Sequence, residues 1–150
     1  MKLRVVGLAA ALAFGPSAFA GDAEWAKLMG AWESQGGTDS ADKVTWLLEA
    51  KGDAMHVTYL QGSQKLAEFE CDTSGRECPA KVSGHSAKIS LWFNGPTLVV
   101  LETKGPEVVK RRFAVAGTGE EMDVELIPVV SKSKAETVHF KRAKVVPFNQ

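Results

Sequence analysis

The sequence predicts an all-β domain: an antiparallel up-and-down meander closed into a single small barrel of about 8–10 strands, after a short N-terminal helix. Three observations carry this prediction. Apolar and polar residues alternate with a period of two along most of the chain, which is typical of strands with one buried face. Turn-forming residues recur roughly every ten residues. The connections between apolar stretches are short, which favours antiparallel neighbours.

The first element of the folded domain is a predicted helix of about two turns over residues 22–29. Asp22 can cap its N-terminus, and Trp25, Leu28 and Met29 share one side. Strands follow to the end of the chain. They are predicted at residues 30–35, 43–51, 54–61, 64–71, 79–83, 86–94, 97–104, 106–116, 121–130 and 136–143.

The barrel is favoured over a two-sheet sandwich, the alternative architecture, because closure removes exposed strand edges. Asn94-Gly95 is a good hairpin signal, and Pro96 behind it indicates a loop longer than two residues. No interdomain linker or repeat stands out, so residues 21–150 are predicted to form one domain, with a loosely held tail at 145–150.

Residues 1–20 have the composition of a secretory signal peptide. Lys2 and Arg4 are basic, residues 3–14 are mostly apolar, and Ala18-Phe19-Ala20 has the small-x-small pattern of a cleavage site. The apolar run is too short for a permanent membrane anchor. We therefore expect export to the periplasm or the extracellular medium, and a mature chain that begins at Gly21.

The charge balance argues against nucleic acid as a partner. The chain has 18 Lys and Arg against 18 Asp and Glu, and loss of Lys2 and Arg4 would leave a net charge of −2. Nucleic-acid binding rests on clustered positive charge. The densest basic run, Lys110-Arg111-Arg112, is interpreted as one solvated face of a hairpin. Acidic residues just downstream balance its positive charge. No later stretch is long and apolar enough to span a membrane.

The two cysteines, Cys71 and Cys78, flank a turn-rich segment and predict a disulfide in an oxidising compartment. A metal site is the alternative, but His56, His85 and His139 lack a zinc-type spacing with them. The spacing is also not that of a redox Cys-x-x-Cys motif. We expect neither a metal nor a cofactor.

Two segments far apart in the chain suggest a family. Gly30-Ala31-Trp32 opens the first strand, and Arg142 lies on the same alternating face as Val138 and Phe140 in the last. This pattern resembles the calycin superfamily of lipocalins, fatty-acid-binding proteins and their bacterial relatives. The resemblance implies a minimal lipocalin-like barrel in which Arg142 packs over Trp32 to close one end, and Gly30 allows the tight turn before the strand. Two departures are the short 34–42 segment, where fatty-acid-binding proteins insert a helical pair, and the absence of a helix after the barrel.

A barrel of this size holds either packed side chains or one small ligand. The sequence offers four aromatic residues for the walls and rim of such a site: Trp46, Tyr59, Trp92 and Phe113. Arg111 shares a face with Phe113, which places a cation indoors. A buried arginine needs a partner, either a carboxylate of the protein or an acid group of a ligand. The favoured interpretation, however, is a bulge that turns Arg111 outward beside Lys110 and Arg112.

The main functional hypothesis is a soluble, exported, lipocalin-like protein that binds a small apolar or amphipathic molecule in an interior cavity of about 300 Å³ or more. The second is an envelope protein-binding or inhibitor module that presents loops to a partner; Trp92-Phe93 beside a loop is either such an anchor or half-buried packing. Catalysis has little support. No nucleophile sits in a recognisable turn, and His85 reads as a surface residue rather than a general base.

Overall fold

The computed structural model of this protein describes residues 25–36 and 40–144. The predicted signal peptide, its cleavage site, the Asp22 cap and the C-terminal tail lie outside the described residues. The described part of the N-terminal helix covers residues 25–28, so it ends one residue earlier than predicted. It stops there because Gly30, with φ at +119°, turns the chain into the first strand.

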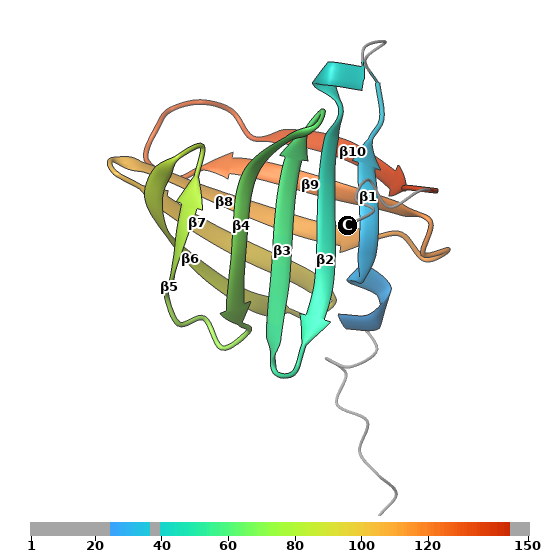
Figure 1. Ribbon diagram of the computed structural model, residues 1–150, viewed down its shortest axis with the longest axis horizontal. Helices are drawn as coiled ribbons and strands as arrows, with labels where there is room; N and C mark the ends of the chain where they lie inside the picture. The colour runs from blue at the N-terminus through green and yellow to red at the C-terminus, as the bar shows by residue number, and fades with distance from the viewer. Residues whose placement is uncertain (1–24, 37–39, 145–150) are drawn as a thin grey trace, which may run out of the picture.

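Ten antiparallel strands form the body of the protein (Figure 1). They are β1 (Gly30–Ser34), β2 (Val44–Lys51), β3 (Ala54–Gln61), β4 (Gln64–Asp72), β5 (Cys78–Val82), β6 (His85–Asn94), β7 (Thr97–Lys104), β8 (Glu107–Val115), β9 (Glu121–Pro128) and β10 (Glu136–Arg142). One 3-10 turn, η1 (Ser40–Asp42), lies between β1 and β2.

The strands close on themselves, because β1 pairs with β2 on one side and with β10 on the other. All other neighbours in space are neighbours in sequence. The predicted antiparallel meander closed into one barrel is therefore confirmed, and the sandwich alternative is wrong. Among the described residues no helix is both long and apolar enough to cross a membrane.

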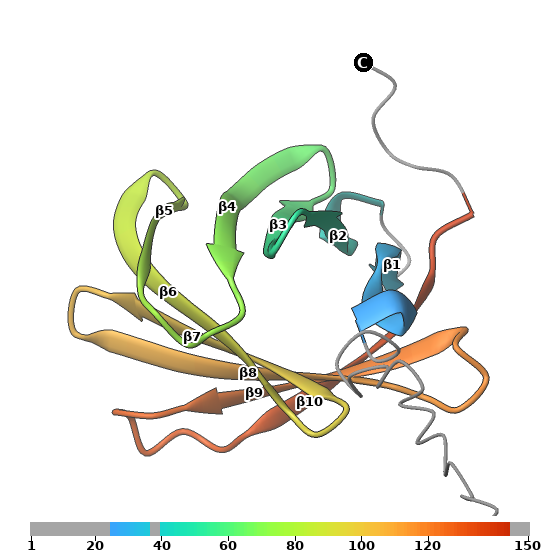
Figure 2. The ribbon, with the colours of Figure 1, turned by 90° about the horizontal axis from the view of Figure 1, so that it is seen from below.

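We call the end of the barrel that carries residues 25–28 the helix end, and the opposite end, with the 129–135 loop, the far end (Figures 1 and 2). Toward the helix end the interior is tightly packed. Its fully buried side chains include Trp32, Phe113, Leu91, Leu98 and Met122.

One guanidinium group holds the helix end together. Arg142 lies 4.3 Å from the ring centroid of Trp32 and donates hydrogen bonds to the carbonyl oxygens of Lys27, Met29 and Gly119 at 2.7–2.8 Å. The Trp32 indole in turn donates to the Leu28 carbonyl at 2.9 Å. The first and last strands are thus joined through the helix, the indole and the β8–β9 turn.

The ladder is weakest between β4 and β5, which we call the seam (Figure 2). Only Ala67–Val82 and Glu68–Lys81 are paired there, whereas β3 and β4 pair along almost their whole length. At the helix end of the seam the predicted disulfide is present, joining Cys71 to Cys78 with their Cα atoms 5.8 Å apart. The covalent bond stands where the hydrogen-bonded ladder is missing.

Candidate ligand-binding site

Several aromatic and charged side chains lie together inside the barrel. Trp46 on β2 is directly opposite Tyr59 on β3, and the two rings stack with centroids 4.3 Å apart. Phe113 on β8 meets the Trp46 ring edge-on at 5.0 Å. Because all three occupy inward positions of their strands, the period-two pattern brings them together. We call these three residues, with Arg111 and Glu102, the interior cluster.

Arg111 points into the barrel and meets a carboxylate there. Its Nη1 donates to Oε1 of Glu102 on β7 at 3.2 Å, and the two side chains are only 13% and 11% exposed. The guanidinium carbon lies 5.7 Å from the Trp46 ring centroid, within the range of a cation–π contact. The sequence left two possible partners for Arg111, a carboxylate of the protein or an acid group of a ligand. In the structure the partner is the protein carboxylate Glu102.

The outward interpretation of Arg111 is wrong. Strand β8 keeps one register with β7 and one with β9 from Val109 to Phe113, without a bulge. The run Lys110-Arg111-Arg112 is therefore not one solvated face. Lys110 and Arg112 lie outside, and the residue between them lies inside, as strand alternation requires.

Burial raises the pKa of the Tyr59 phenol above its ordinary value. The positive charge of Arg111 acts in the opposite direction, and the negative charge of Glu102 reinforces the rise. The hydroxyl therefore stays protonated at neutral pH and can both donate and accept a hydrogen bond.

Trp92 is not part of the interior cluster. It lies on the outer face of β6, half-buried, and its backbone forms an isolated bridge with Ser74. Its neighbour Phe93 points inward and packs near Trp25, with ring centroids 6.0 Å apart. The Trp92-Phe93 pair is thus half-buried packing split between two faces.

The histidines also lie away from the interior. His56 sits on the outer face between Glu49 and Glu68, at 3.3 and 2.9 Å, and His139 pairs with Asp123 on the outer face of β10. His85 is exposed and begins β6 rather than lying in a loop. Within the described part of the chain no three His, Cys, Asp or Glu side chains are grouped to hold a metal ion.

Sequence reasoning missed Glu102, although a signal was present. Leu98, Val100 and Glu102 occupy successive inward positions of β7, so the carboxylate interrupts an apolar face just as Arg111 does on β8. Two opposite charges on the inner faces of neighbouring strands would have indicated a pair.

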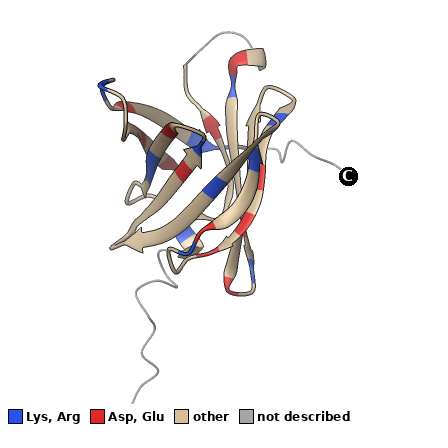
Figure 3. Ribbon diagram, turned by 90° about the vertical axis from the view of Figure 1, so that its left-hand side faces the viewer, with Lys and Arg blue, Asp and Glu red and all other residues tan. Residues whose placement is uncertain are grey.

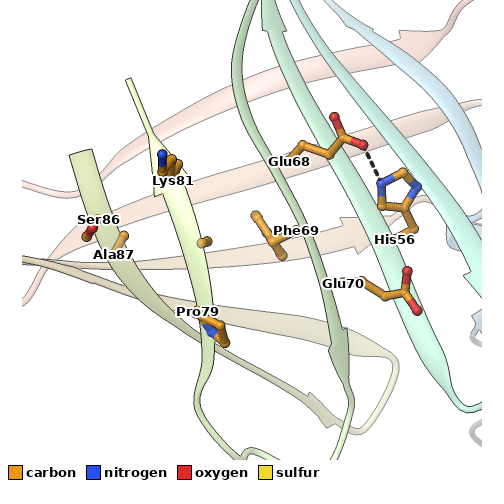
Figure 4. A pocket seen from close by; sticks show the side chains of 9 residues that line it. His56, Glu68, Phe69, Glu70, Pro79, Lys81, Ser86 and Ala87 are labelled. Carbon is orange, nitrogen blue, oxygen red and sulfur yellow. Dashed lines mark hydrogen bonds and ion pairs between the residues drawn. The ribbon is translucent and has the colours of Figure 1, made fainter. Parts of the chain in front are cut away.

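The described cavities lie outside this cluster. An open surface pocket of about 650 Å³ lies at the seam (Figure 4), with Phe69 and Ala87 at its base and the polar residues His56, Glu68 and Lys81 along its edge. Another, of about 480 Å³, is at the far end beside Val108, Pro128 and Val130. Neither these nor the two smaller ones are lined by Trp46, Tyr59 or Arg111. They are not the interior cavity that the ligand hypothesis requires.

Partly buried apolar side chains line the far-end side of the cluster. Val44, Leu126 and Val138 point inward on that side of the Arg142–Trp32 closure and are only partly buried. On the outer surface, acidic and basic positions are interspersed along the strands rather than gathered by sign (Figure 3).

No protein-family model and no curated protein matches this sequence. Solved structures do match. A secretory abundant heat soluble protein from Ramazzottius varieornatus superposes with a TM-score of 0.65 at 14% identity, covering 78% of this chain and 96% of that one. A Schistosoma mansoni fatty acid binding protein in complex with arachidonic acid gives 0.65 at 15%, covering 81% and 99%. The REP1-NXSQ fatty acid transporter gives 0.60 at 14%, covering 81% and 99%.

These matches define the class of the fold. The chain has a closed ten-strand antiparallel barrel, and its fold is similar to that of a fatty acid transporter and a fatty acid binding protein. The resemblance inferred from the sequence is confirmed at the level of the fold. The nine residues from Gln35 to Lys43 stand between β1 and β2, and only η1 is helical among those described there.

Proposed function

We propose that this protein binds one small apolar or amphipathic molecule inside the barrel, reached from the far end. The observation that carries the proposal is the Arg111–Glu102 pair beside stacked aromatic rings in the interior. Replacing a buried ion pair with well-packed apolar side chains often leaves the stability of a protein unchanged or raises it. An interior ion pair at a position where apolar side chains would be equally stable is typical of a functional site.

The two sides of the interior cluster suit an amphipathic molecule. Tyr59, held by stacking on the buried Trp46, offers an aromatic wall, and Arg111 with Glu102 offers hydrogen-bonding groups. The apolar part of the molecule would lie toward Val44, Leu126 and Val138. The likeness to a fatty acid transporter and to a fatty acid binding protein supports this function. The proposal assigns no reaction to the barrel.

The experiment is native mass spectrometry of the protein purified from its own source, followed by titration with single-chain lipids. We expect a bound small molecule. The Trp46→Leu variant should bind about tenfold more weakly, because it loses the stacking wall. Trp92→Leu is the matched control on the outer face and should bind as the parent does. A protein free of any small molecule that also binds none of the lipids would contradict the proposal.

We also propose that the protein is exported, to the periplasm or the medium. The composition of residues 1–20 and the Cys71–Cys78 disulfide support this location. The intact mass of the protein isolated from its source tests it: the mature chain should begin at Gly21. A chain that retains residues 1–20 would contradict export by this route.

A second candidate is an envelope module that binds another protein. Val129 and Val130, in the loop after β9, are 53% and 67% exposed, which favours a contact surface at the far end. A protein partner that co-purifies in place of a small molecule, and is lost when both valines are changed to Ser, would favour this candidate over the first.

A further inference from the structure

We infer that the interior cluster selects a neutral polar head group, such as an alcohol or a primary amide, against a carboxylate. This inference rests on the proposed ligand binding and specifies the chemical class of the ligand. It comes from the way Glu102 and Arg111 are arranged.

The charge of Arg111 is already balanced. Glu102 lies diagonally across the β7–β8 ladder from Arg111. The residue directly opposite Glu102 is Val109, two residues before Arg111 on β8. Both side chains are nearly buried, so water screens their fields poorly. A carboxylate brought to Arg111 would also lie close to Glu102, and two neighbouring carboxylates disfavour each other's charged forms. The site therefore has no net attraction for an anion.

The hydrogen-bonding capacity of the pair is not exhausted. A guanidinium has five N–H donors, and among the described residues Arg111 gives one hydrogen bond, to Glu102. No fully buried side-chain nitrogen or oxygen in the described part of the chain lacks a partner. The remaining nitrogens of Arg111 are therefore not completely buried, and we take them as the donors offered to a molecule in the barrel.

Donors and an acceptor thus stand side by side. A hydroxyl or primary amide can accept from Arg111 and donate to Glu102 at the same time, whereas a carboxylate can only accept. Tyr59 lies within the field of both charges and adds a neutral hydroxyl, because burial keeps its phenol protonated. The three groups together carry no net charge and match a head group that is itself uncharged.

The test compares two ligands with the same chain, dodecanol and dodecanoate, at about pH 8, where the acid is ionised. Isothermal titration of the mature protein gives both dissociation constants. We expect dodecanol to bind at least about tenfold more tightly. In Glu102→Gln the unbalanced Arg111 should favour dodecanoate, shifting the ratio by at least about tenfold in its direction. Glu107→Gln, an exposed position on the same hairpin, is the matched control and should keep the parental ratio.

A double variant separates charge from shape. Glu102→Gln combined with Arg111→Gln removes both charges, so the preference for the alcohol should return. If Glu102→Gln alone does not fold, as judged by circular dichroism, the parental comparison decides. Dodecanoate binding as tightly as dodecanol in the parent overturns this inference and leaves the carrier function standing. A parent that binds neither ligand overturns this inference, and the carrier function falls with it only if native mass spectrometry also finds no bound small molecule.

Discussion

Tyr59 is the single tyrosine of the chain, so its ionisation can be followed without interference. We expect the phenolate absorbance of the folded protein to appear above the ordinary pKa of 10.0, because burial disfavours the charged form. In denaturant the midpoint should return to the ordinary value. A folded-state midpoint at or below the ordinary one would contradict the buried position of the phenol.

The same shift has a consequence for stability. Since the folded-state pKa is raised, the phenol contributes stability that is present below pH 10 and is lost as the pH rises through the folded-state value. Urea unfolding of the parent and of Tyr59→Phe across this alkaline range measures it. The parent should lose more stability than the variant.

Gly30 is required for two reasons. Its φ of +119° is unfavourable for other residues, and an added Cβ would lie 2.9 Å from Nη1 of Arg142. We expect Gly30→Ala to lower the free energy of unfolding by about 2–3 kcal/mol. Gly95→Ala, at φ +59° with open space around it, should cost only about 1 kcal/mol. Equal losses in urea unfolding would mean that neither the more extreme φ nor the contact with Arg142 adds to the cost at Gly30.

At the scale of single residues, the sequence located much of the interior cluster. The alternation of β2, β3 and β8 put Trp46, Tyr59 and Phe113 on inward faces, and the structure brings them together. It did not separate Trp92 from them. Trp92 is large and aromatic like the others, but it falls one position out of phase with Leu91 and Phe93, so strand alternation turns it outward.

At the scale of elements, the seam is the weakest join of the barrel. With only two residue pairs, Ala67–Val82 and Glu68–Lys81, β5 depends on the disulfide to remain beside β4. This arrangement gives the disulfide a local as well as a global effect on stability.

We expect the double variant Cys71→Ala with Cys78→Ala to lose about 2–3 kcal/mol of unfolding free energy. Amide hydrogen exchange in β5 should quicken more than global destabilisation accounts for, because the seam opens locally. Amides of β7 and β8, which pair over seven positions, serve as the internal reference. Exchange that rises equally in β5 and β7 would show that the seam does not open on its own.

The strand boundaries were predictable from the sequence, whereas the number of residues that pair between neighbouring strands was not. Turn residues such as Gly95 and Gly105 mark the hairpins, and the predicted strands agree closely with β2, β3 and β7. How many residues pair across the seam depends on the curvature of β4 and β5 in the closed barrel. That curvature is a property of the whole sheet and has no local sequence pattern.

At the scale of the whole molecule, closure brings together the two ends of the chain. Arg142 reaches carbonyl groups of Lys27 and Met29, which precede it by 115 and 113 residues. It holds three carbonyl oxygens and one aromatic face at once, which suits the flat, forked guanidinium.

Arg142→Lys should therefore be strongly destabilising although it keeps the charge. An ammonium group cannot reproduce the fork over the Trp32 ring, so we expect a loss of about 3 kcal/mol in urea unfolding. Arg112→Lys, on the exposed outer face of β8, is the matched control and should change stability by less than about 0.5 kcal/mol. Similar small effects from both substitutions would contradict the closing role of Arg142.

The sequence by itself determined the all-β class, the approximate number of strands and most of their inward faces, because period-two alternation and turn residues act over a few neighbouring positions. It also indicated the disulfide, whose cysteines are separated by only a short turn. Only the tertiary structure decided that Arg111 turns inward to meet Glu102, and that β4 and β5 barely pair. These depend on which strands become neighbours and how the closed sheet curves, and both are settled by packing between residues distant in sequence.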